Sequence, residues 1–338
     1  MTRPRRLAAG LAVVAAAAII VVGPPAPAQP SSSHAAALLR AAADAATRHA
    51  YAGVLTVRWT DQGQTHQART AVHLANGAVE VGTGDQRALS MDGQRWVGTP
   101  GSWTLVLGTG AAAASPPRPT ANWNLQARVG PVVAGEATTV VVASDPGSGA
   151  VRARFYVDEA TGLLLRREIL DPDGRVEREV TFDRLVELGP VVPPLPPTTT
   201  RAAEPTPVGS MPSGYPAPRT LGHGYRLLGR YRLPDGTIQL YYGDGLFTLS
   251  LFEQKGTIDW GEVPPGQSEH IGGVDARLIA TPTTSAVVWE ARGIVTTCVS
   301  DAPSDQVLAA VRDLVDTGGS SSVGSDIAHF VLGPFGWN

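Results

Sequence analysis

Cysteine is nearly absent from this chain of 338 residues, since Cys298 is the only one, and a single cysteine excludes an internal disulfide. The chain also lacks the G-x-S-x-G elbow that presents the catalytic serine of many hydrolases. Ser268 lies two residues before His270, a spacing more typical of a strand edge than of a catalytic pair. Because no acid, base and nucleophile assemble from the sequence, we expect a protein that is not an enzyme.

An excess of basic residues is lacking too. Lys and Arg number 27 against 30 Asp and Glu, and a net charge of −3 gives no reason to expect a nucleic-acid partner. Lys255 is the only lysine, so the basic residues are almost all arginine, and alanine is abundant. We interpret this bias as the mark of a GC-rich genome, such as an actinobacterial one, rather than as chemistry.

Metal-ligand spacing is likewise missing. His66 and His73 lie seven residues apart, so on one continuous strand their side chains would point to opposite faces of the sheet. Asp171 and Asp173, followed by Gly174, begin like a calcium loop, but the later ligands and the closing glutamate are absent. We interpret that segment as a hairpin turn and predict neither a metal nor a cofactor.

The N-terminus has the features of an export signal. Arginines within residues 3–6 precede an uninterrupted apolar run over residues 7–22, which is shorter than the ~20 residues that a spanning helix needs. Ala26-Pro27-Ala28 offers a cleavage site, and no nearby cysteine is available for lipid attachment. We predict a signal peptide over residues 1–28, with an uncleaved anchor as the alternative, and therefore an exported, extracytoplasmic protein.

Residues 151–185 carry the clearest structural pattern. Two turn signals, Glu159–Gly162 and Asp171–Gly174, separate three runs of similar length. The first run alternates apolar residues with arginines, and the third alternates valine and phenylalanine with Glu177, Glu179 and Asp183. Period-two alternation bounded by turns predicts an antiparallel meander with one buried face.

The surrounding residues predict a first domain over residues 31–189, with one helix over residues 31–50 and about ten strands. The expected strands outside the meander cover residues 51–59, 67–74, 78–81, 94–97, 104–107, 129–133 and 138–143. Hairpin turns are expected at Asn76-Gly77 and Asp92-Gly93, and residues 108–122 are expected to be a loop.

A proline- and threonine-rich connector over residues 190–212 marks the clearest domain boundary. Proline stiffens a chain into an extended form, so we expect the two domains to be able to sit apart or to hinge. A smaller α+β domain is expected over residues 213–317, followed over residues 318–338 by a Gly/Ser spacer and an apolar tail.

The second domain is predicted to contain six strands and a helix. The strands are expected over residues 224–233, 237–242, 246–254, 270–280, 286–291 and 294–299. The strand over residues 246–254 has apolar residues on both faces and is predicted to be central, and Cys298 is expected to be a small buried hydrophobe. The helix is expected to begin at Pro303 and to end at Gly318-Gly319.

Four tryptophans fall in the first domain: Trp59, Trp96, Trp103 and Trp123. Large aromatic side chains on an open sheet are suited to lining an apolar cavity, and the alternative is that they fill the core. Lining of an apolar cavity by these four residues is our hypothesis for a binding site.

Three stretches of the chain resemble the MucB/RseB family of extracytoplasmic sigma-factor regulatory proteins. They are Tyr51–Val57 where the helix leads into the first strand, Phe155–Val176 in the meander, and Leu240–Phe252 in the second domain. The long proline-rich connector and the apolar tail depart from the family pattern.

This resemblance implies a fold and a function. The fold would be α+β and mainly antiparallel β: a half-open β-barrel with a helical plug, similar to lipoprotein carriers of the LolA/LolB type, beside a smaller domain. The function would be to bind the extracytoplasmic region of a membrane anti-sigma factor and to sense a lipid-like ligand. A lipid or lipoprotein carrier of the cell envelope is the alternative, and an envelope scaffold is a third. The family carries no catalytic motif onto this sequence.

Overall fold

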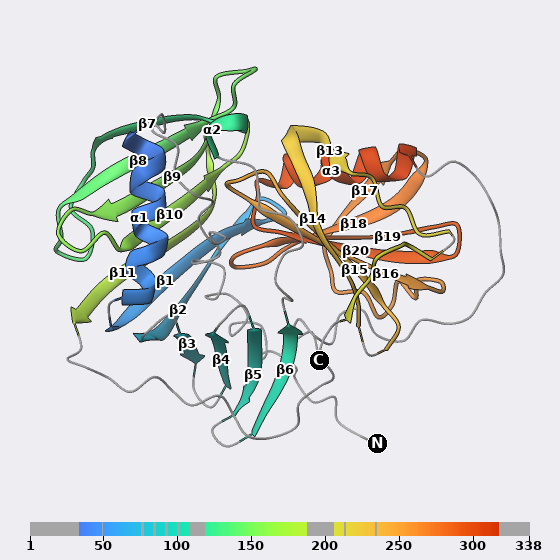
Figure 1. The fold of residues 1–338 in the computed structure, drawn as a ribbon, viewed down its shortest axis with the longest axis horizontal. Helices are drawn as coiled ribbons and strands as arrows, with labels where there is room; N and C mark the ends of the chain where they lie inside the picture. Colours follow the sequence, from blue (N-terminus) through green and yellow to red (C-terminus); the bar gives the residue numbers. More distant parts are fainter. Residues whose placement is uncertain are drawn as a thin grey trace.

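Figure 1 shows the computed structural model of the chain, which describes residues 34–48, 50–75, 78–83, 86–91, 94–99, 102–108, 119–187, 206–212, 214–233 and 235–317. These residues form two large antiparallel sheets with few helices, so the expected mainly antiparallel α+β fold is confirmed. The predicted signal peptide, most of the connector and the C-terminal tail lie outside the described residues. None of the described helices is both long and apolar enough to span a membrane.

The first sheet has eleven strands in the order β6-β5-β4-β3-β2-β1-β11-β10-β9-β8-β7. Within the described residues its two margins, β6 and β7, do not pair with each other, so the sheet is open. The strands are β1 (Tyr51–Asp61), β2 (Gln64–Ala75), β3 (Ala78–Thr83), β4 (Gln86–Met91), β5 (Gln94–Thr99), β6 (Ser102–Gly108), β7 (Asn124–Val129), β8 (Thr138–Ser144), β9 (Val151–Asp158), β10 (Leu164–Leu170) and β11 (Val176–Glu187).

The predicted meander is confirmed as β9, β10 and β11. Gly162 and Gly174 hold φ angles of 77° and 80° in its two turns, a conformation that glycine adopts without steric cost. Strand β4 was not predicted, and the strand expected over residues 129–133 lies instead at Asn124–Val129. Gly130 and Pro131 interrupt the expected strand, because proline lacks the backbone donor that a ladder needs.

Strand β1 joins the two halves of the first sheet by pairing with both β2 and β11. The β1–β11 pairing brings together residues far apart in sequence, and the chains come very close at Gly53. A Cβ atom on Gly53 would lie 2.6 Å from the carbonyl oxygen of Arg184, so only glycine fits there. The turn residues 76–77 and 92–93 lie outside the described residues, although the strands on either side of each pair antiparallel as expected.

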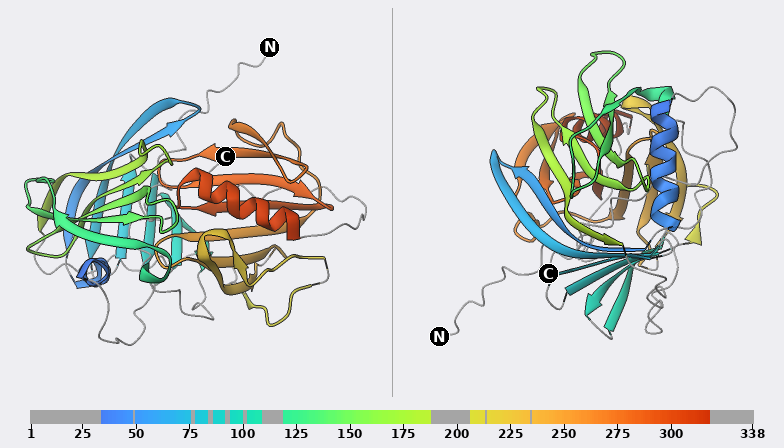
Figure 2. Two further views of the ribbon diagram at one scale, coloured as in Figure 1. Left: turned by 90° about the horizontal axis from the view of Figure 1, so that it is seen from above. Right: turned by 90° about the vertical axis from the view of Figure 1, so that its left-hand side faces the viewer.

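Helix α1 (His34–Arg48) lies on one side of the bent first sheet, which Figure 2 shows curving around it. It contacts β7, β8, β9, β10 and β2. Its buried residues recur at helical spacing, as Ala35, Leu39 and Ala42 show. The open, bent sheet with a helix on its inner side fits the half-open barrel with a helical plug.

The second sheet has the strand order β12-β14-β15-β16-β20-β19-β18-β17, with β13 beside β14. Its elements are β12 (Thr206–Pro207), β13 (Thr220–Leu221), β14 (Tyr225–Arg232), β15 (Ile238–Gly243), β16 (Thr248–Lys255), β17 (Gln267–Ile271), β18 (Val274–Ala280), β19 (Ser285–Ala291) and β20 (Ile294–Ser300). The short helices α2 (Pro119–Asn122) and η2 (Gly222–Gly224) and the longer α3 (Ser304–Thr317) complete the described fold.

Two sequence predictions for this sheet have opposite outcomes. Strand β16 lies between β15 and β20, so its predicted central position is confirmed. The single strand predicted over residues 270–280 is wrong, because Gly272 and Gly273 both have positive φ angles, 56° and 85°, and reverse the chain between β17 and β18.

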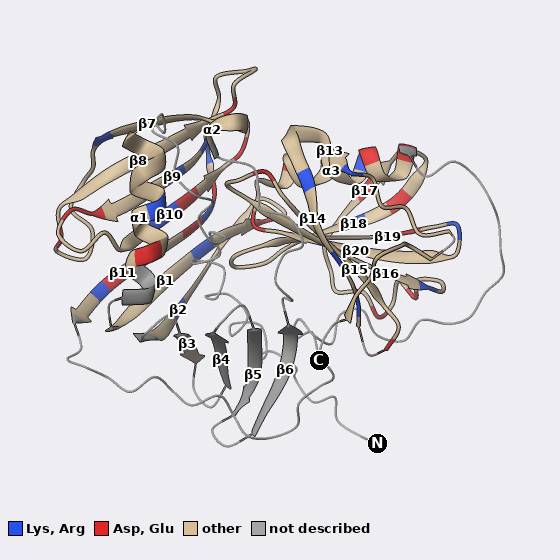
Figure 3. Ribbon diagram, in the orientation of Figure 1, with Lys and Arg blue, Asp and Glu red and all other residues tan. Residues whose placement is uncertain are grey.

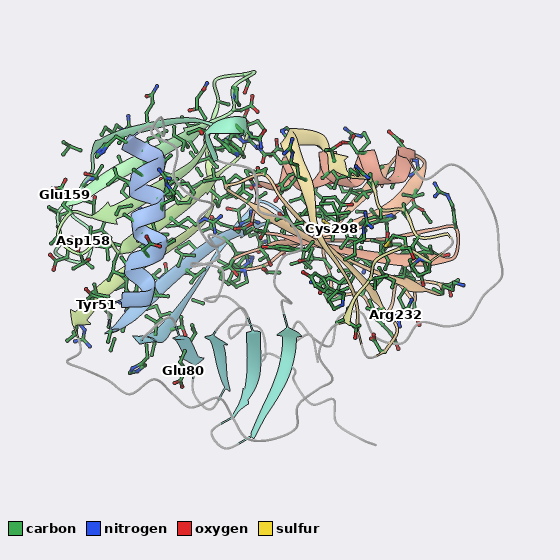
Figure 4. All side chains as sticks on the ribbon, viewed as in Figure 1. Tyr51, Glu80, Asp158, Glu159, Arg232 and Cys298 are labelled. Carbon is green, nitrogen blue, oxygen red and sulfur yellow. The ribbon has the colours of Figure 1, made fainter. Side chains whose placement is uncertain are left out.

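The core of the second sheet lies between the sheet and α3. Leu240, Leu251 and Cys298 lie opposite one another on β15, β16 and β20, and each is fully buried. Figure 4 shows Cys298 in the middle of this sheet, and burial raises the pKa of its thiol, as expected for a small buried hydrophobe.

Replacement of Leu251 by alanine tests this core. Leu251→Ala should lower the free energy of unfolding by about 2–5 kcal/mol, because it leaves a cavity in a fully buried site. Urea denaturation measures the change. Val129→Ala is the matched control, since Val129 is 87% exposed and its truncation should change stability by no more than about 0.5 kcal/mol. Equal effects of the two substitutions would contradict the placement of Leu251.

Candidate functional site

The inner face of the first sheet is the face on which α1 lies, and it can be traced across the strands from their register. Residues directly opposite one another in antiparallel strands share a face. One row of such partners runs from β8 to β1: Val141, Phe155, Arg167, Val180 and Val57. We use this row to define the inner face.

The end of the second sheet is seated on this inner face, next to α1 (Figure 2). The β15–β16 turn brings Phe247 against Trp123, with ring centroids 5.3 Å apart and the rings edge to face. Phe247, Trp123 and Phe155 belong to one buried cluster that also includes residues of α1 and α3. Although the connector suggested that the two parts can sit apart, in the structure they share a hydrophobic core.

Two arginines of the first sheet form ion pairs with the second at this junction. Arg167 of β10 donates to Asp301 at 2.8 Å, and its guanidinium lies 5.7 Å and 5.6 Å from the ring centres of Phe155 and Phe247. Arg152 of β9 pairs with Asp305 in the first turn of α3. Both arginines are largely buried, but Asp305 is 42% exposed, so only the pair of Arg167 and Asp301 lies in a medium that screens charge poorly.

A third arginine, Arg178 of β11, is buried without a carboxylate in hydrogen-bonding contact. Its guanidinium donates to the hydroxyl of Ser285 in β19 and to the carbonyl of Ala302, which lies between β20 and α3. Burial lowers the pKa of Arg178, and the negative charge of Glu177 acts in the opposite direction. Glu177 itself accepts the backbone N–H of Ser304 at 3.0 Å, at the beginning of α3.

The meander was predicted to have one buried face with its arginines on the other, and this prediction is wrong because both faces are buried and the inner face includes arginines. Arg178 lies opposite Ile169 on the inner, apolar face. Arg152 lies at a register shift between Ala143 and Ser144, where the strand gains a residue and alternation breaks. The sequence pattern gave no sign of these roles, because the groups that accept from the arginines come from the second sheet.

The outer face of the meander is also buried, beneath a ladder of charges that crosses β9, β10, β11 and β1 (Figure 3). Arg154 and Arg166 both pair with Glu168, Arg166 also pairs with Glu179 at 2.7 Å, and Glu179 pairs with Arg58 at 3.2 Å. The two carboxylates are 3% and 8% exposed, whereas the arginines remain partly in solvent. The arginine stems cover the two carboxylates and shield them from water, while the guanidinium groups stay partly in solvent.

Asp244, in the β15–β16 turn, joins the two sheets by a different means. Its carboxylate accepts the backbone N–H groups of Leu246 and Phe247, both at 2.7 Å, and the indole N–H of Trp123 at 3.2 Å. The Asn122 side chain donates to the backbone carbonyl of Asp244 at 2.8 Å. Burial raises the pKa of Asp244 to about 7, because the loss of hydration outweighs the hydrogen bonds that favour the charged carboxylate.

Strands β1, β2 and β3 extend the inner face as an apolar strip away from the junction. We call this the inner strip, and it consists of Tyr51, Leu55, Val57, Val72 and Val81, which are all nearly fully buried. Figure 4 marks Tyr51 at its start. All five side chains are apolar and none is more than 2% exposed, so they form a buried apolar layer on the inner face.

Of the four tryptophans of the cavity hypothesis, Trp59 and Trp123 pack against different buried clusters. Trp59 is half-buried on β1, packs against the inner strip's cluster and stacks on His66 at 5.3 Å. Trp123 lies in the junction rather than on the strip. Trp96 and Trp103 lie on β5 and β6, and their side chains are outside what the structure describes. Lining of a cavity by these residues stays a prediction.

The histidine interpretation agrees with the register. His66 lies opposite Trp59 and His73 opposite Ala52, which places the two histidines on opposite faces of β2. Ser268 and His270 lie on β17, at the edge of the second sheet, as expected. Among the residues that the structure describes, no three His, Cys, Asp or Glu side chains gather closely enough to hold a metal ion.

Substitution of Arg178 tests the junction. Arg178→Met keeps most of the apolar stem but leaves the buried Ala302 carbonyl without its donor, so the free energy of unfolding should fall by about 1–3 kcal/mol. Arg175→Met is the control, because Arg175 is 77% exposed in a turn of the meander. Chemical denaturation that gives the same stability for both variants would contradict the buried role of Arg178.

Two buried carboxyls should make stability depend on pH. Burial raises the pKa of Asp244 to about 7 and that of Glu253 on β16 to about 8, above their ordinary values. Their stabilising contribution is therefore complete below about pH 4 and is lost as the pH rises through about 7 and 8.

Asp244→Asn and Glu253→Gln should each flatten this fall in stability relative to the unsubstituted protein, as measured by urea denaturation across that pH range. Asp173→Asn, in an exposed turn, should leave the slope unchanged, and unchanged slopes in all three variants would refute the assignment.

Comparison with known proteins gives structural similarity only. No family model and no curated protein matches the chain. The complex of MucA and MucB from Pseudomonas aeruginosa is similar at 18% identity, covering 83% of this chain and 97% of that chain, with a TM-score of 0.47. A structure of MucB is similar at 19% identity, covering 85% and 98%, with a TM-score of 0.44. The LolA superfamily protein NE2245 from Nitrosomonas europaea is similar at 10% identity, covering 80% and 92%, with a TM-score of 0.21. Solved structures similar to this chain thus include the MucB/RseB family that its sequence motifs resemble.

Proposed function

We propose that this protein is an exported regulatory binding protein that holds the extracytoplasmic region of a membrane anti-sigma factor and senses a lipid-like ligand. Export rests on the predicted signal peptide over residues 1–28. The class of partner rests on the sequence resemblance, and MucB, whose structure has been determined with MucA(peri), shows the kind of segment to test.

One observation carries the proposal: two of the three motif stretches that resemble the family, in the meander and in the second domain, supply the contacts that seat the second sheet on the first. Tyr51–Val57 forms β1, which joins the halves of the first sheet. Phe155–Val176 supplies the meander on which the second sheet is seated. Leu240–Phe252 forms the β15–β16 hairpin, whose turn enters the junction. Two sheets that share a buried core suit a protein that holds another molecule.

The inner strip supports the ligand part of the proposal. Buried apolar residues on β1, β2 and β3 continue the face on which α1 and the second sheet lie. A lipid-like ligand that bound there would contact a surface continuous with the junction. It would shift the binding of the partner only if it bound the free and the occupied protein differently.

A lipid or lipoprotein carrier of the cell envelope is the second candidate. The same inner strip and the half-buried Trp59 favour it. A carrier has no evident use for the second sheet, which contributes several buried residues to the junction, so we rank this candidate lower.

Binding to the anti-sigma factor tests the first candidate. The purified protein should bind the extracytoplasmic segment of a membrane anti-sigma factor from the same organism, with a Kd of about 1 µM or below, as measured by calorimetry. A segment of equal length and charge with scrambled sequence is the control. Absence of binding at about 100 µM, a concentration that detects even weak complexes, would reject the proposal.

Mass spectrometry under native conditions separates the two candidates. A carrier should retain acyl chains after purification and should show a change in tryptophan fluorescence when lipid is added. Leu55→Asp places a charge on the inner strip and should abolish lipid retention, whereas Val186→Asp, at an exposed position on β11, should not. Lipid retention without binding of the anti-sigma segment would favour the carrier.

A further inference from the structure

Among the described residues, no strand pairs with the outer side of β7, at the margin of the first sheet. Strand β7 pairs with β8 on one side, and the described sheet ends there on the other. Figure 1 shows β7 at the outer border of the first sheet, and Asn124, Gln126, Arg128 and Val129 are exposed. Such an edge offers a row of hydrogen-bonding groups to another extended chain.

The groups that point outward can be assigned from the ladder. The backbone N–H of Gly130 donates to the carbonyl of Thr138 at 2.7 Å, which makes these two residues a hydrogen-bonded pair. Hydrogen-bonded and non-hydrogen-bonded pairs alternate along an antiparallel ladder. The N–H and C=O groups of Leu125, Ala127 and Val129 therefore point away from β8.

Some of the usual protections of an edge strand are missing from β7, although α1 contacts it and Arg128 gives it one charge. Its six residues contain no lysine and no proline, and its register with β8 has no bulge. The margins of the second sheet differ. Strand β12 has two residues, one of them Pro207, and β17 carries Glu269 and His270, whose side chain is hydrogen-bonded to Asp275.

Side chains along the edge indicate the kind of chain that fits. Leu125 and Ala127 are partly buried against the core, while Val129 is 87% exposed, so the inner-face side of the edge is apolar up to its end. Arg128 is exposed on the other side. An added strand would gain from apolar residues at alternate positions and from an acidic residue near Arg128.

We propose that the free edge of β7 is a docking site for an extended segment of the partner protein, which adds to the first sheet as a further strand. The inference rests on the proposed function for the identity of that partner. The backbone of β7 supplies the hydrogen bonds, and its alternating apolar side chains set the register of the segment.

Proline substitution at the edge tests this inference. Ala127→Pro removes an outward-pointing N–H but none that bonds to β8, so the fold should persist, as checked by the melting curve. The Kd for the extracytoplasmic segment of the anti-sigma factor should rise at least tenfold. Val129→Asp, which places a charge on the apolar side of the edge, should weaken binding in the same direction.

Controls and hydrogen exchange define the other outcomes. Val132→Asp changes an exposed valine just beyond the strand and should leave the Kd unchanged. In the complex, the amides of Leu125, Ala127 and Val129 should become protected from hydrogen exchange, whereas those of Gln126 and Arg128 should be protected already in the free protein.

Unchanged affinity in Ala127→Pro, or unprotected edge amides in the complex, would overturn the edge inference but leave the proposed function standing. A dimer that Ala127→Pro converts to monomer would assign the edge to a second copy and overturn it, and absence of binding by the unsubstituted protein would overturn both proposals.

Discussion

The burial of arginine side chains at the junction of the two sheets is the constraint on which the rest of the structure depends. A guanidinium removed from water must find acceptors, and Arg178 finds them in the Ser285 hydroxyl and the Ala302 carbonyl. Arg167 finds a carboxylate in Asp301. These acceptors belong to the second sheet and to the residues that follow it. The first sheet alone therefore cannot supply hydrogen-bond acceptors for the arginines on its inner face. The two sheets therefore form one body, whatever the length of the connector between them.

The same meander buries charge on both of its faces by different means. On the inner face, arginines reach acceptors on another part of the chain. On the outer face, Glu168 and Glu179 are enclosed by arginines of neighbouring strands, so the sheet satisfies its own charges. The outer ladder stabilises local pairing between strands, whereas the inner contacts fix the position of the second sheet. A chain whose basic residues are nearly all arginine is suited to both, because the planar guanidinium bonds several acceptors at once.

Two parts of the first sheet, the inner strip and the margin at β7, lie outside the junction. The second sheet and α1 occupy part of the inner face, and the inner strip, which includes Leu55 and Val57, extends beyond the junction. The margin at β7 lies at the outer border of the first sheet and offers backbone groups rather than side chains (Figure 1). The β7 margin and the inner strip are thus distinct from the junction, where burial raises the pKa of Asp244 to about 7.

The sequence by itself determined the local structure, because turns and period-two alternation depend on neighbouring residues. Gly162 and Gly174 mark the turns of the meander, and the apolar faces of the strand around Leu251 predict its central position. Alternation failed where acceptors come from elsewhere, because it assigned the arginines of the meander to a face other than the buried one. Only the tertiary structure decided these roles, since a buried charge is stable only beside partners that lie far away along the chain.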